Sequence, residues 1–160
     1  MIRDRSLIEA AARETEAELR RIDSRIDPAF REEFQNYTHH FTIFRAAPVV
    51  IVPLFRPVTG LTALLVQDAP VDLLERLRRM ERHAAMMSVA MAIQNLLLAA
   101  ESADLGACCV TAPLLAAAGL SDLLEIPDGW EIAALVAVGW PAESPPDPGR
   151  KPVQSIVLRK

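Results

Sequence analysis

An apolar run in the middle of the chain limits what this sequence can fold into. Between Ala84 and Ala100 the polar residues are Ser88, Gln94 and Asn95. Apolar residues surround this segment on nearly all sides of a helix, so we predict a helix over about residues 86–103 at the centre of the fold. The run is shorter than the roughly 20 predominantly apolar residues that span a bilayer. We therefore interpret it as a core helix in which Gln94 and Asn95 hydrogen-bond to neighbouring groups.

The residues after this run predict the end of the helix and a short strand. Gly106 is typical of a helix C-terminus, and Ala107 to Val110 are expected to form a strand. Cys108 and Cys109 are adjacent there, so their side chains should point to opposite faces of the strand. Their spacing is neither that of a CxxC redox pair nor that of a zinc half-site. We interpret both as buried structural thiols and predict no metal site.

Composition and charge limit the function. The 160 residues are 51% hydrophobic, which suits a single domain over residues 1–160. The net charge is −4, with a pI near 5.4, so a nucleic-acid partner is disfavoured. The charged N-terminal segment lacks the apolar core of a secretory signal. We therefore expect a cytoplasmic protein with no membrane or nucleic-acid partner.

Two helices are expected near the N-terminus. Apolar residues recur at helical spacing from Ile8 to Ile26, and this helix should end near Asp27. Asp27-Pro28 then resembles a cap and first turn. Five aromatic residues follow at spacings of 4, 3, 4 and 3: Phe30, Phe34, Tyr37, Phe41 and Phe44. They would share one helix face, which we interpret as core or as a dimer interface, with a cofactor site a distant third.

Other segments favour a mixture of strands and helices. Val49 to Val52 is expected to be a strand buried on both faces, and Trp130 to Trp140 a central strand. A helix is predicted over Val71 to Met80, whose charges indicate a solvated face without a function. A last strand is expected over Val153 to Leu158. The chain lacks GxSxG, GxxxxGK[ST], HExxH and GxGxxG, so hydrolase and nucleotide-kinase functions lose their support.

Four segments, in this order, resemble the nitroreductase family of FMN-dependent oxidoreductases. They are "FRAAPVVIVPLFRP", "SVAMAIQNLLLAAESADLGACCVTAP", "LLEIPDGWEIAALVAVGWP" and "GRKPVQSIV". The resemblance runs from about Phe30 to Lys160. It implies an α+β fold with a mostly antiparallel sheet, flanking helices, a long buried core helix and two interlocked protomers. The Leu-Gly turn would lead into a strand that passes along the flavin.

The resemblance also implies site residues. The turn after the strand would place the backbone N–H groups of Thr111 and Ala112 beside the reactive edge of the flavin, where they would stabilise charge on the ring. Pro113 and Leu114 would shape the pocket. After the proline-rich loop, Arg150 would bind the FMN phosphate, with Lys151 as a second candidate. Without the resemblance, these two basic residues read as an exposed turn.

The family usually begins with two segments that this chain does not show. One is an Arg-x-Ser-x-Arg segment that holds the flavin, and the other is a Pro-Ser…Asn-x-Gln-Pro-Trp segment that lies against it. Arg3-Asp4-Arg5-Ser6 is a superficial echo, because the stretch "RDRSLIEAAARE" matches the helix that follows those segments. The chain is thus similar to the family without its N-terminal part. An in-frame start upstream of Met1 would also explain the difference.

The resemblance predicts a homodimer with FMN at the subunit interface. NAD(P)H would reduce the flavin, which would then reduce a nitroaromatic, a quinone or a similar acceptor. The alternative is a non-catalytic protein of this fold that has lost the flavin site and serves in dimerisation or small-ligand binding. A flavin-destroying or dehalogenating activity is a further possibility within the same fold.

Overall fold

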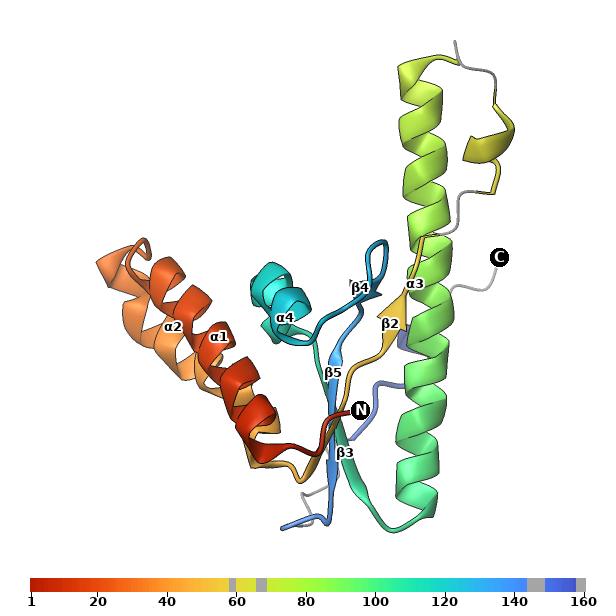
Figure 1. Ribbon diagram of the computed structural model, residues 1–160. Helices are drawn as coiled ribbons and strands as arrows, with labels where there is room; N and C mark the ends of the chain where they lie inside the picture. The colour runs from red at the N-terminus through yellow and green to blue at the C-terminus, as the bar shows by residue number, and fades with distance from the viewer. Residues whose placement is uncertain (58–59, 66–68, 144–148, 158–160) are drawn as a thin grey trace.

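A three-stranded antiparallel sheet forms the middle layer of the molecule. In this computed structural model, which describes residues 1–57, 60–65, 69–143 and 149–157, the strand order is β1 (Val49–Ile51), β5 (Leu135–Gly139) and β3 (Gly106–Val110). β5 lies in the centre, with Val50 opposite Ala137 and Cys108 opposite the same residue on the other side. Helices α1, α2 and α4 lie on one side of the sheet and α3 on the other (Figure 1).

The predicted strand over Trp130 to Trp140 is divided in two. β4 (Glu131–Ile132) pairs with β2 (Leu54–Phe55) in a separate ladder, whereas β5 joins the main sheet. The chain changes partner at the buried residues Ala133 and Ala134, and the N–H of Ala133 donates to the carbonyl of Pro53 at 2.9 Å. The prediction of a buried β1 also needs correction. Val50 is buried, but its neighbours in β1 are half-buried. β1 is the outermost strand of its sheet, and its other edge is bridged by Ile2 through Val50.

One continuous helix, α3 (Val71–Ser102), replaces the two helices expected there. Its C-terminal part runs along the sheet, and its N-terminal part extends beyond the strands, where it lies beside the short helix η3 (Thr62–Leu64) (Figure 1). Its inner face packs on the strands: Ile93 forms a cluster with Phe55, Ala134 and Val136. Helix η3 is fixed to α3 because Glu81 accepts hydrogen bonds from the N–H of Thr62 at 3.0 Å and from its hydroxyl at 2.6 Å.

The outer face of α3 carries an exposed apolar stripe. Its members are 48–62% exposed: Met80, Met87, Met91 and Leu98. At 100° per residue, spacings of 7, 4 and 7 place all of them within about 20° of Met80. Gln94 and Asn95 are also exposed, so the expectation that they bind neighbouring backbone within the chain is wrong. By length and composition alone α3 could cross a membrane, and 11% of its most apolar window is buried.

The end of α3 differs from the expected glycine stop. The helix ends at Ser102, and Asp104 takes the left-handed conformation with φ 56°. Asp is among the residues that tolerate this conformation, because its short side chain bonds locally. Gly106 is instead the first residue of β3, where it pairs with Gly139. Gly106 therefore belongs to the strand and does not terminate the helix.

The second helical layer packs its apolar residues against the other face of the sheet. α1 (Arg5–Asp23) starts at Asp4, whose carboxylate accepts from the N–H of Ser6 at 2.8 Å, and ends at Asp23 rather than near Asp27. α1 packs against η4 (Ala112–Ala116) and α4 (Ala117–Leu123). The shared core includes residues that are at most 1% exposed, among them Ile8, Ala12, Phe44, Leu120 and Leu135.

The aromatic residues after Asp27 do not share one face, because the segment is not one helix. It consists of η1 (Pro28–Phe30), α2 (Arg31–Thr38) and η2 (His39–Ala46), with a non-helical Thr42 at φ −115° and ψ 20°. Asp27 does cap the start, accepting from the N–H of Ala29 at 2.9 Å. The interpretation as core is right for Phe44 at 0% exposure and wrong for Phe30 at 61% and Tyr37 at 68%.

The expected last strand is absent over the part of 153–158 that the structure describes. Val153–Ser155 form the short helix η5, and residues 156–157 continue without a strand partner there. Leu158 lies outside the described residues. Pro152 precedes η5, and the carbonyl of Pro152 accepts from the N–H of Ser155 at 2.9 Å. A turn of this kind satisfies locally the backbone groups that a strand would have paired.

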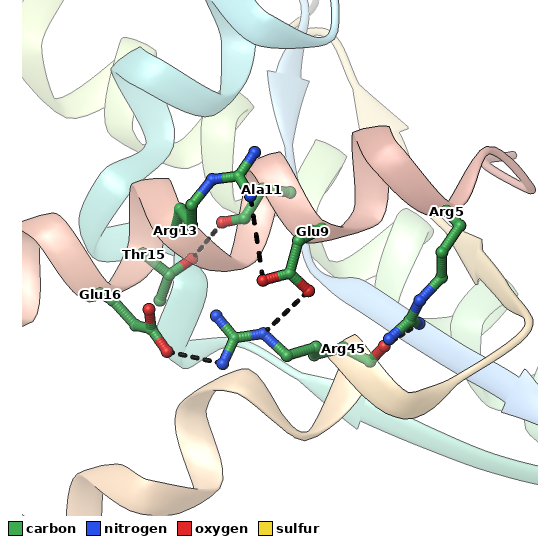
Figure 2. Close-up of polar contacts among 7 residues, drawn as sticks. All are labelled: Arg5, Glu9, Ala11, Arg13, Thr15, Glu16 and Arg45. Atoms are coloured by element: carbon green, nitrogen blue, oxygen red, sulfur yellow. Dashed lines mark hydrogen bonds and ion pairs between the residues drawn. The ribbon is translucent and has the colours of Figure 1, made fainter.

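Arg45 links α1 to η2 through two carboxylates of α1 (Figure 2). Its Nη1 lies 2.8 Å from Oε1 of Glu16, and its Nε lies 3.3 Å from Oε2 of Glu9. Arg5, the first residue of α1, donates to the carbonyl of Arg45. The hydrogen bond from Arg45 lowers the pKa of Glu16 below its ordinary value of 4.5. This network fixes how the N-terminal helices sit on the sheet.

The Arg45–Glu16 pair should stabilise the fold above about pH 4.5 and stop doing so at lower pH. The folded pKa of Glu16 is depressed, so its contribution is present above the unfolded pKa and is lost as the pH falls through the folded value. Both side chains are 33% exposed, so we expect Glu16→Gln to lower the free energy of unfolding at pH 7 by only ~0.5 kcal/mol. Urea unfolding at pH 7 and below the folded pKa checks this. An equal loss at both pH values would contradict it.

Candidate functional site

The four residues predicted to line the flavin edge lie together in one turn at the end of β3. Thr111 precedes η4, and its carbonyl accepts from the N–H of Leu114 at 3.0 Å. Pro113 is buried and Leu114 half-buried, which holds the turn against the core. The first N–H groups of a helical turn have no partner within the helix. The N–H of Ala112, the first residue of η4, is therefore available in position to donate to a ligand.

Arg150 and Lys151 lie apart from this turn in sequence, and they follow residues 144–148, which lie outside the described residues. Both side chains are exposed. Gly149 takes φ 71°, a conformation that favours glycine, and its carbonyl accepts from Nη1 of Arg150 at 2.9 Å. Among the described residues, neither basic side chain takes part in an ion pair. The guanidinium of Arg150 thus keeps donors for a further acceptor.

A cavity of about 300 Å³ lies between α3, α4 and β4 and touches the predicted turn at Leu114. Thr111, Ala112, Pro113 and the two basic residues do not line it. Its walls are formed by nine residues: Arg82, Met86, Leu114, Ala117, Ala118, Ser121, Trp130, Glu131 and Ile132. The cavity is therefore next to the predicted flavin edge rather than part of it.

The cavity contains an ion pair that sequence reasoning missed. Nη1 of Arg82 lies 2.6 Å from Oε2 of Glu131, although the two residues are 49 positions apart. The Arg82 guanidinium also lies over the ring of Phe55, 5.5 Å from its centroid. In the sequence Arg82 belongs to a run of charges with the pattern of a solvated helix face. The pairing of Arg82 with Glu131 can be recognised only in the folded chain, where β4 brings Glu131 to α3.

Both cysteines are exposed, so the interpretation as buried structural thiols is wrong. They lie on β3, which has β5 on one edge and no strand on the other within the described sheet. Partial burial still raises the pKa of the Cys109 thiol, with a smaller contribution from Cys108. Cys108 lines a second cavity, of about 470 Å³, at the end of the sheet near Trp140 and Pro48.

The fold and the site define a layered α+β protein with backbone donors at the end of one strand. The family is shown by sequence: the sequence model of the Nitroreductase family matches residues 3–140. The chain therefore belongs to the Nitroreductase family. This confirms the resemblance and the α+β fold with an antiparallel sheet, flanking helices and a long helix.

Solved structures with the same fold include flavoproteins. A BluB-like flavoprotein from Clostridium difficile 630 matches with a TM-score of 0.83 and 25% identity over 99% of this chain and 77% of that chain. A nitroreductase with bound FMN from Desulfitobacterium hafniense DCB-2 matches with a TM-score of 0.65 and 18% identity, covering 99% and 73%. An NADPH:FMN oxidoreductase from Vibrio harveyi complexed with NAD+ matches with a TM-score of 0.58 and 19% identity. The match covers 99% of this chain and 56% of that chain.

Proposed function

We propose that this protein is an FMN-dependent oxidoreductase that passes electrons from NAD(P)H to a nitroaromatic, a quinone or a similar acceptor. The observation that carries the proposal is the turn at the end of β3, in a chain that belongs to the Nitroreductase family. The family supports an oxidoreductase, and the BluB-like flavoprotein and the nitroreductase with bound FMN, which share the fold, support FMN. The complex of the Vibrio harveyi enzyme with NAD+ supports a nicotinamide partner.

Two sets of donors would hold the flavin mononucleotide in this proposal. The N–H groups of Thr111 and Ala112 would face the ring edge, and the buried Pro113 fixes their direction. A backbone donor at that edge stabilises negative charge as it develops. Arg150 presents a planar fork that matches phosphate oxygens, and Lys151 adds a second positive charge. FMN, when bound, supplies the electron-transfer chemistry, and these residues hold and orient it.

The outer face of α3 supports a homodimer. A helix that is apolar on all sides must be covered on all sides, and the sheet covers only the inner face, at Ile93 and Ala100. A second copy of the chain would cover Met87 and Met91. Gln94 and Asn95, which are exposed beside these residues, would then hydrogen-bond across the interface. We favour a second copy over a membrane-spanning role, because the inner face of the same helix packs on the sheet and carries Arg82.

Arg150→Ala should weaken FMN binding by at least about tenfold, since a charge-assisted hydrogen bond to phosphate is lost. The measurement is a titration of FMN fluorescence, with riboflavin as a ligand that lacks the phosphate. Riboflavin should bind the wild type and the variant equally. Arg76→Ala is the matched control, because Arg76 is an exposed arginine paired with Asp72 on α3. An unchanged FMN affinity in Arg150→Ala would remove this residue from the proposed site.

The test of the function is the visible spectrum of the purified protein before and after FMN is added, with gel filtration alongside. A flavin spectrum that stays with the protein and bleaches on addition of NAD(P)H is the expected result. A colourless protein that does not retain FMN would favour the alternative, a non-catalytic relative that serves in dimerisation or ligand binding. The proposed oxidoreductase activity would then be withdrawn.

A further inference from the structure

The cavity between α3, α4 and β4 contains charged and aromatic groups that the flavin proposal does not use. We propose that it binds a planar aromatic anion, of which an aromatic carboxylate is the simplest form. This inference deepens the proposed function and rests on it for the role of the ligand: an anion whose ring also carries a reducible group, such as a nitro group, would be the electron acceptor. The cavity touches Leu114 of the predicted flavin turn, so a ligand there would lie next to the ring edge.

Arg82 is held in place before any ligand arrives. Its Nη1 lies 2.6 Å from Oε2 of Glu131, and its guanidinium lies over the ring of Phe55 at 5.5 Å. A guanidinium has five N–H donors in a rigid plane. The contact with Glu131 uses one side of this plane, and Arg82 remains 48% exposed. The remaining donors can bind a ligand carboxylate without a new arrangement of the side chain.

Trp130 gives the same cavity an aromatic wall. The indole is 40% exposed and lies at the start of β4, beside Glu131. The guanidinium of Arg56 lies 5.5 Å from the centroid of the Trp130 ring. The charged groups that contact Arg82 or Trp130 here are thus Glu131, which lines the cavity and pairs with Arg82, and Arg56, which does not line the cavity. A guanidinium with unused donors beside an aromatic wall favours an anion with a flat ring.

The remaining walls suit the body of a small ring. Met86, Leu114 and Ala117 are apolar, and Ser121 adds a hydroxyl. An apolar cavity of about 150 Å³ holds benzene, so the 300 Å³ of this cavity has room for a substituted ring. Arg82 and Met86 lie about 200° and 240° from Met80 around the α3 axis. They face the sheet, and a partner on the outer stripe of α3 would leave this cavity open.

The test compares 4-nitrobenzoate with nitrobenzene, which share a ring and a nitro group and differ in the carboxylate. Binding is followed through Trp130 fluorescence in a Trp140→Phe background, because the protein has two tryptophans and Trp140 is 78% exposed and away from this cavity. We expect saturable quenching, with 4-nitrobenzoate bound at least about tenfold more tightly than nitrobenzene, as a charge-assisted contact requires. No saturable quenching by either probe would overturn the inference.

Two substitutions should move the affinity in opposite directions. Arg82→Gln should abolish the preference for 4-nitrobenzoate, whereas Glu131→Gln should increase it, since a competing carboxylate is removed from Arg82. A purely structural role for the pair would make both variants weaker or leave both unchanged. Arg82→Lys keeps the charge without the fork and should keep part of the preference. A preference that survives in Arg82→Gln would overturn the inference.

The result separates this inference from the proposed function. FMN retention is measured on the same samples. FMN binding with no discrimination between the two probes would overturn the anion site and leave the oxidoreductase in place. Discrimination by Trp130 fluorescence without FMN binding would support the anion site as a ligand site and remove the acceptor role.

Discussion

Phe44→Ala is expected to lower the free energy of unfolding by about 3–5 kcal/mol. Phe44 is 0% exposed and packs in the core with Ile8, Leu120 and Leu135. Removing its ring takes apolar surface out of the core and leaves a cavity between α1 and the sheet. Urea unfolding followed by circular dichroism measures the loss.

Phe30→Ala is the matched control for this prediction. Phe30 belongs to the same aromatic repeat and undergoes the same chemical change, but it is 61% exposed. Its loss should change the free energy of unfolding by no more than about 0.5 kcal/mol. If the protein is studied as a dimer, the comparison is made at one protomer concentration, since association adds to apparent stability. Equal losses at the two positions would contradict the division of the aromatic repeat at Thr42.

Met91→Asp is expected to convert the proposed dimer into a monomer at micromolar concentration. Met91 is 62% exposed in the single chain and lies in the middle of the outer stripe of α3. An interface that covers Met91 would bury an unpaired carboxylate, which costs several kcal/mol and weakens association by at least about 100-fold. Analytical ultracentrifugation over a range of concentrations measures the dissociation constant.

Val71→Asp introduces the same charge on the same helix and should leave association unchanged. Val71 is 71% exposed at the first turn of α3, half a turn away from the stripe, and a carboxylate is favourable at a helix N-terminus. A wild-type chain that stays monomeric at all concentrations would remove the homodimer from the proposal. A dimer that survives in Met91→Asp would place the interface elsewhere.

The sequence predicts those elements whose signals are local. β3 was expected over Ala107 to Val110 and begins one position earlier, and the Asp27 cap is present as expected. The continuity of α3 was missed because charged residues between Met80 and Met86 interrupt the apolar spacing without breaking the helix. The aromatic repeat was misread for the opposite reason. The spacing of the aromatic residues is regular, but it would place them on one face only in a continuous helix, and Thr42 is not helical.

The candidate site also has a part that local sequence predicts and a part that only the fold brings together. Thr111 to Leu114 are consecutive, so a single turn must keep them together, and the resemblance pointed to that turn. Arg82 and Glu131 are far apart in sequence, and only the β2–β4 ladder brings Glu131 to α3. The exposure of Gln94 and Asn95 also could not be read from the sequence. An apolar helix covered by its own chain and one covered by a second chain have the same composition.

The order of strands in the main sheet has a consequence for how the protein is made. β5 lies between β1 and β3, yet it is the last of the three to be synthesised. β1 and β3 have no ladder with each other, so neither has a partner strand in this sheet until residue 139 is available. Pairs so distant along the chain form slowly, because loop closure comes before the gain from contacts. The nascent chain must therefore carry α3, with two uncovered apolar faces, from residue 102 until residue 139 is available. Exposed apolar surface of this kind on a partly folded chain is prone to aggregation and is what chaperones bind.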